Sequence, residues 1–113
     1  MPEGLISNGV THMTNILNPL SFTATGTEAL PWADGETREV GTVEASLGGK
    51  TKLVDAVRYD SGRIVSWDFT GRYRTGTKAW PATVSIDPDG QERVWYGKDH
   101  HTGRCQKTGL SFK

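Results

Sequence analysis

Between Arg63 and Trp95, apolar and polar residues alternate with the two-residue period of half-buried β-strands. The apolar side of the first strand consists of Val65, Trp67, Phe69 and Tyr73. The polar side consists of Ser66, Asp68, Thr70, Arg72 and Arg74. Gly71 interrupts the apolar row, and a glycine inside a strand predicts a bulge or a sharp bend.

A second alternation follows a turn-like Thr-Gly-Thr segment at 75–77, with apolar residues at Trp80, Ala82, Val84 and Ile86. Pro81 has no N–H to donate, so we expect it in an edge strand or at the start of a strand. The chain then reverses at Asp-Pro-Asp-Gly (87–90), where proline presets φ and glycine accepts a positive φ. These features predict a hairpin whose return strand covers 93–96.

Shorter alternations predict strands over 20–25, 38–47 and 52–59, and a terminal strand over 110–112. Turn residues separate these strands: Gly48-Gly49 predicts a tight hairpin, and Asp60-Ser61-Gly62 predicts a second reversal.

Three residues break the pattern of these earlier strands. Val40 is out of phase with Val43 across Gly41, which predicts a bulge there. Asp55 interrupts the side formed by Leu53, Val57 and Tyr59, so we expect it to pair with Arg58 or Arg72. Trp32 lies in a predicted loop over 26–37, and we expect it to cover the core, with exposure for binding as the alternative.

Together these patterns predict an all-β fold, an antiparallel meander of about five to six strands curled into a small barrel or a compact sandwich. No window longer than about eight residues has a helical period. The domain organisation we predict is a flexible N-terminal tail over 1–12 and a single β domain over 13–113. A chain of 113 residues has room for one modest core.

Charge changes this picture because it is unevenly distributed along a chain with no net charge. Residues 1–60 contain four Lys/Arg and eight Asp/Glu, a balance of −4, whereas residues 61–113 contain nine and five, a balance of +4. This separation is typical of two oppositely charged faces, of self-association or of an acidic partner for the basic half. Cancellation within the fold is the alternative.

Residue patterns typical of catalytic or metal sites are weak. Gly49-Lys50-Thr51 lacks the earlier glycine and the following helix of a phosphate-binding loop. Asp99, His100, His101 and Cys105 have metal-ligand chemistry, but adjacent histidines usually point apart and a structural zinc needs four convergent ligands. No histidine and acid accompany a nucleophile in a recognisable context. We therefore predict no enzyme activity, no cofactor and no metal site.

Recognition is the function that the sequence favours. Arg72 and Arg74 lie on the polar side of their strand, and Trp95 is out of phase with its neighbours. Arginine and tryptophan dominate protein–protein hot spots. The predicted binding residues are Arg72, Arg74, Trp95, Lys98, His100, His101 and Arg104.

The function we predict is binding to another protein, as an accessory or inhibitory factor of the kind that phages and mobile elements encode. One alternative is a barrel that binds single-stranded nucleic acid through its Arg/Trp face, although the pI of about 6.8 disfavours it. Self-association through an edge strand is another. Purely structural ion pairs between these arginines and Asp68, Glu92 or Glu44 are a third.

The sequence has no apolar run of membrane length and no signal-peptide core, so we expect no membrane association. The single cysteine excludes a disulfide framework within the chain, and we expect a cytoplasmic location.

Overall fold

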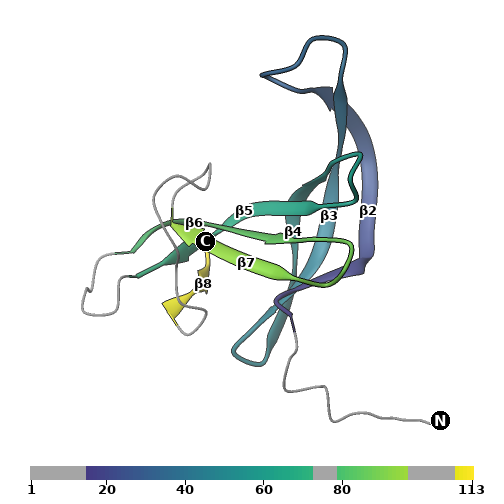
Figure 1. Ribbon diagram of the computed structural model, residues 1–113. Helices are drawn as coiled ribbons and strands as arrows, with labels where there is room; N and C mark the ends of the chain where they lie inside the picture. The colour runs from purple at the N-terminus through teal and green to yellow at the C-terminus, as the bar shows by residue number, and fades with distance from the viewer. Residues whose placement is uncertain (1–14, 73–78, 97–108) are drawn as a thin grey trace, which may run out of the picture.

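The computed structural model describes residues 15–72, 79–96 and 109–113, which form one antiparallel sheet (Figure 1). Its strands are β2 (Leu17–Ala29), β3 (Thr37–Leu47), β4 (Lys50–Arg58), β5 (Ile64–Gly71), β6 (Trp80–Ile86), β7 (Glu92–Tyr96) and β8 (Ser111–Phe112). The first six pair in chain order, and β8 pairs with β5. The predicted antiparallel meander is confirmed.

The sheet does not close into a barrel, so the barrel alternative is wrong. In Figure 1 the long β2–β3 hairpin runs across the direction of β5, β6 and β7 and extends beyond them. Apolar side chains from two parts of the chain, residues 16–56 and residues 64–110, form one core. The first part contributes Ile16, Leu17, Val43, Ala45, Val54 and Ala56. The second contributes Ile64, Phe69, Ala82, Val84, Ile86, Val94, Tyr96 and Leu110.

A carboxylate joins the two ends of the meander. The Glu92 side chain at the start of β7 accepts the backbone N–H groups of Ile16 and Leu17, each at 2.8 Å. Asn15 donates to the Gly90 carbonyl beside it. One side chain therefore satisfies two N–H groups at the start of β2 and connects them to β7, although these two strands do not pair in the sheet.

The predicted turns have the expected backbone geometry. Positive φ occurs at Gly48 and Gly49, which join β3 to β4, and at Gly62 and Gly90. In the turn after β6, the Gly90 N–H donates to the Asp87 carbonyl and the Asp87 N–H donates to the Gln91 carbonyl. This is the type I turn with a bulge that the sequence predicts. The predicted turn at 75–77 lies outside the described residues.

The bulge expected in β3 lies in its partner strand. β3 pairs with β4 without interruption from Glu39 to Leu47, whereas the β2–β3 register shifts between Asn18 and Thr23 and again between Ala24 and Gly26. β2 approaches Gly41 so closely that an added Cβ would overlap the Thr23 carbonyl. Gly41 is therefore required by the close approach of a neighbouring backbone.

The side of β4 that faces the core is the opposite of the predicted one. Val54 and Ala56 are core residues, while Leu53 is 65% exposed and Asp55 is exposed. Val57 is buried but is not part of the core cluster. The expected partners of Asp55 are also wrong, because Arg58 forms its ion pair with Glu39 and no ion pair among the described residues joins Asp55 to Arg72.

The predicted phase of β5 is also wrong, because the pairing of this strand with β6 is irregular. The β5–β6 register shifts between Ser66 and Phe69. Phe69 therefore joins Ile64 in the core, although these two residues would lie on opposite sides of a regular strand. Ser66 is fully buried as well. The irregularity lies at Trp67 and Asp68 and not at Gly71.

β6 is central to its half of the sheet, with β5 and β7 on either side. Ala82, Val84 and Ile86 are core residues as predicted, but Thr83 and Ser85 are buried too. Pro81 is the second residue of this strand, which agrees with a position at the start of a strand. Within the described residues, no helix has the length and apolar character to span a membrane.

Candidate functional site

Two of the seven predicted binding residues lie in the described part of the chain. Arg72 is exposed directly after β5, and its carbonyl accepts the Tyr96 hydroxyl, which links the ends of β5 and β7. Trp95 is half-buried opposite Thr83, on the other side of β7 from Val94 and Tyr96. The others, Arg74, Lys98, His100, His101 and Arg104, lie outside the described residues.

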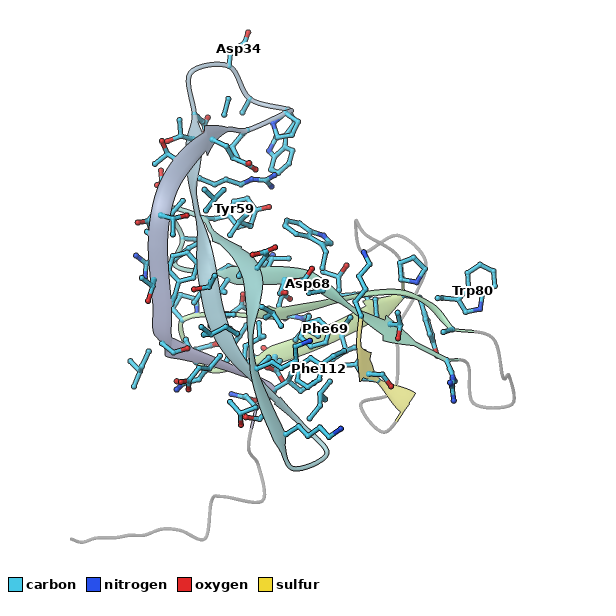
Figure 2. The ribbon with its side chains drawn as sticks, turned by 180° about the vertical axis from the view of Figure 1, so that it is seen from behind. Asp34, Tyr59, Asp68, Phe69, Trp80 and Phe112 are labelled. Atoms are coloured by element: carbon cyan, nitrogen blue, oxygen red, sulfur yellow. The ribbon has the colours of Figure 1, made fainter. Side chains whose placement is uncertain are left out.

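The structure brings together a group of side chains that the sequence did not point to. Three aromatic rings surround the guanidinium group of Arg38 in β3. They belong to Trp32 in the loop of the β2–β3 hairpin, Tyr59 after β4 and Trp67 in β5. We call these four residues the aromatic cluster. Figure 2 shows Tyr59 between the hairpin loop and β5, with Asp68 on the same side of β5 and Phe69 and Phe112 on the opposite side.

Arg38 is at the centre of the aromatic cluster. Its guanidinium carbon lies 5.9 Å from the centroid of the Trp32 ring, 5.7 Å from that of Tyr59 and 5.5 Å from that of Trp67. These distances are within the range of cation–π attraction. The Trp32 and Tyr59 rings are also neighbours, with centroids 6.2 Å apart and planes tilted by 35°. The Arg38 guanidinium therefore links the hairpin loop to β3, to the end of β4 and to β5.

Hydrogen bonds fix the guanidinium in place. Arg38 donates from Nη1 to the Tyr59 hydroxyl at 2.8 Å and from Nε to Glu28, with which it also forms an ion pair. Partial burial lowers the pKa of Arg38, but the hydrogen bonds to Glu28 and Tyr59 outweigh that effect and raise it overall. Arg38 therefore stays charged at every relevant pH, and the aromatic cluster is preorganised.

Trp32 is the exposed member of the aromatic cluster. The residue is 67% exposed, so the prediction that it covers the core is wrong and the alternative of an exposed Trp32 is confirmed, while its use in binding stays a prediction. The loop that carries it is ordered by backbone hydrogen bonds, including one from the Leu30 N–H to the Glu36 carbonyl at 2.9 Å. A large aromatic group is thus presented to solvent from a fixed backbone.

The charge around the hairpin is negative. Over residues 15–60, which are all described, seven Asp/Glu face four Lys/Arg, a balance of −3. Asp34 and Glu36 beside Trp32 are exposed, and Glu28 is bound to Arg38. Figure 2 places Asp34 at the end of the hairpin. The predicted separation of charge along the sequence therefore gives the hairpin an acidic character in space.

No metal site is found among the residues that the structure describes, since no group of three or more His, Cys, Asp and Glu converges there. The candidate ligands Asp99, His100, His101 and Cys105 lie outside these ranges. Comparisons of the chain with protein-family models, with curated proteins and with solved structures find no match.

Proposed function

We propose that this protein is a non-enzymatic protein-binding module and that the aromatic cluster is its main contact surface. The observation that carries the proposal is the position of Trp32, which is 67% exposed and lies against the Arg38 guanidinium. That guanidinium is held by the Glu28 carboxylate and by two further aromatic rings. An exposed tryptophan has no role in the core of its own domain and is costly to leave in water.

The residue types and their rigidity support this proposal. Tryptophan, tyrosine and arginine account for most interface hot spots. Binding is strongest when the contact residues are ordered beforehand, because the entropy of ordering them is not lost on association. Glu28 and Tyr59 fix Arg38, which in turn supports Trp32, so the surface is ordered before a partner arrives.

The acidic hairpin favours protein over nucleic acid as the partner of this surface, because phosphates are repelled by negative charge. An accessory or inhibitory role in the cytoplasm completes the proposal, and the single cysteine agrees with a reducing compartment. The predicted contribution of Arg72, Arg74, Trp95, Lys98, His100, His101 and Arg104 stays a prediction, as does self-association.

The proposal is tested by affinity capture from a lysate of the source organism, with and without nuclease, using the wild-type chain, Trp32→Ala and Trp80→Ala. Trp80 is the matched control because it is 40% exposed and lies at the far end of β6 from the hairpin (Figure 2). A hot-spot tryptophan contributes about 2 kcal/mol or more, so Trp32→Ala should reduce capture at least about thirtyfold.

The expected result is a discrete protein that survives nuclease, is lost with Trp32→Ala and is retained with Trp80→Ala. Capture that is unchanged in Trp32→Ala contradicts the proposal. Material that disappears with nuclease would replace it with nucleic-acid binding.

A further inference from the structure

A hollow lies beside the aromatic cluster, on the side of the sheet away from the core. It measures about 230 Å³ and is open to solvent. Its lining joins three apolar or aromatic side chains to two carboxylates: Val40, Val57, Trp67, Asp55 and Asp68. Thr25, Gly41 and Ala56 complete it. Trp67 belongs to both the hollow and the aromatic cluster, so the two sites are continuous.

The hollow forms where β4 and β5 separate. These strands pair only at Val57–Val65 and Arg58–Ile64, and beyond that point side chains replace the ladder. The Asp55 N–H donates to Asp68 Oδ2 at 2.9 Å, and the Ser66 hydroxyl donates to the Asp55 carbonyl at 2.6 Å. The β5 irregularity that overturns the predicted phase is what turns Asp68 toward Asp55.

The same hydrogen bonds fix the Asp68 carboxylate and the backbone of Asp55. Asp68 is held by its bond from the Asp55 backbone, and the Lys113 N–H donates to the Asp68 carbonyl at 3.0 Å. Within the described ranges, no Lys or Arg forms an ion pair with Asp55 or Asp68. With Glu28 and Arg38 included, this neighbourhood has three carboxylates and one guanidinium, a balance of −2.

This combination of groups suits one kind of occupant. An organic cation on an aliphatic stem can place its charge between carboxylates and its stem against an indole ring and two valines. A simple metal ion would make no use of the apolar wall. A phosphate or a carboxylate would be repelled. A planar guanidinium satisfies the carboxylates and stacks on the ring better than an ammonium does.

We propose that the hollow receives a basic side chain, arginine in preference to lysine, from the protein that binds the aromatic cluster. This inference rests on the proposed function, because the side chain is supplied by that partner. It gives the partner a stated chemistry: a basic residue flanked by apolar contacts for Trp32.

The hollow is tested directly with N-acetyl-arginine amide as the probe and N-acetyl-citrulline amide as its neutral isostere, followed by ¹H–¹⁵N NMR of the full chain. The arginine probe should shift the amides of Asp55 and Asp68 and the indole N–H of Trp67, and citrulline should not. Asp55→Asn and Asp68→Asn should each weaken binding about three- to fivefold, as expected for a partly exposed ion pair.

Asparagine at position 68 keeps an oxygen for the Asp55 N–H, so these variants should remain folded. Asp60→Asn is the matched control, because Asp60 is an exposed acid in the turn after β4. Equal shifts from both probes, no shifts at all, or the same weakening in Asp60→Asn would overturn the inference.

Capture of the partner separates this inference from the proposed function. Loss of capture in Asp55→Asn with Asp68→Asn, but not in Asp60→Asn, supports both. Loss in Trp32→Ala with full retention in the double variant supports the contact surface and overturns the basic side chain in the hollow. Retention in all variants overturns the contact surface, and the hollow as a partner site with it.

Discussion

Arg38 and Arg58 show that two arginine ion pairs on neighbouring strands can contribute differently. The Arg38 side chain is 13% exposed and bonds to Glu28 and Tyr59 beneath aromatic rings. The Arg58 side chain is 38% exposed and pairs with Glu39. A pair is worth more when water is excluded from it and when other groups share the charge.

Arg38→Met should therefore lower the free energy of unfolding by about 1–2 kcal/mol, because it keeps the aliphatic stem but removes the hydrogen bonds and the cation. Arg58→Met should cost less than about 1 kcal/mol. Urea unfolding of both variants measures the difference. Equal losses would mean that the aromatic cluster is not preorganised by Arg38.

The hydrogen bonds of Asp87 predict that the stability of the fold depends on pH. Its carboxylate accepts hydrogen bonds from Arg63 and Arg93 at 2.7 and 2.8 Å, and these bonds lower its pKa. A group with a lowered pKa in the folded state stabilises the fold above its unfolded pKa, about 3.9, and loses that contribution as the pH falls through the folded value.

Asp87→Asn should therefore be less stable than the wild type at neutral pH, and the difference should shrink below about pH 4. Urea unfolding across that range provides the measurement. Glu39, whose pKa is lowered by the hydrogen bond from Arg58, gives the control variant Glu39→Gln, with a smaller effect because it has one partner and is more exposed. A constant difference for Asp87→Asn at all pH values would rule out this linkage.

At the scale of the strands, Gly41 is the residue that lets β2 cross close to β3. A Cβ at this position would overlap the Thr23 backbone, whereas a Cβ at Gly26 would lie 3.7 Å from a Val40 methyl group, an ordinary contact. Gly41→Ala should cost about 2–3 kcal/mol through displacement of β2, and Gly26→Ala should change stability by less than about 1 kcal/mol. Thermal unfolding compares them, and similar melting temperatures would contradict the close approach.

Strands and turns were predictable where the signal is local. The Gly48-Gly49 turn and the turn at 87–90 follow from residues that accept positive φ. The phase of β4 was not predictable, because Leu53, Val54 and Val57 are all apolar and only the neighbouring layer decides which face the core. The phase of β5 failed because a side-chain bond between Asp68 and the Asp55 backbone stabilises an irregular strand.

The aromatic cluster was less predictable than the strands. Trp32 and Trp67 are 35 residues apart, and nothing local indicates that both lie beside Arg38. The available signal was a tryptophan in a loop bounded by Pro31 and the Asp34-Gly35 pair, for which exposure was the alternative to covering the core. The binding role of all seven predicted residues stays a prediction, and five of them lie outside the described ranges.

For the whole molecule, the charge separation and the bent sheet act together. The hairpin that carries Trp32 extends beyond the other strands (Figure 1). It has an acidic character, and the hollow at the β4–β5 separation adjoins the aromatic cluster through Trp67. An extended hairpin anchored by the core gives a small domain a rigid surface that a partner can reach. The surface is therefore expected to select a partner with basic and apolar contact residues.

The most direct test of the contact surface is hydrogen–deuterium exchange of the protein alone and with its captured partner. We predict slower exchange on binding in residues 25–42 and 55–59, which hold the hairpin end and the strand beside the hollow, and no change in residues 80–86. Protection confined to residues 80–86 and 93–96, with the hairpin unchanged, would contradict this prediction.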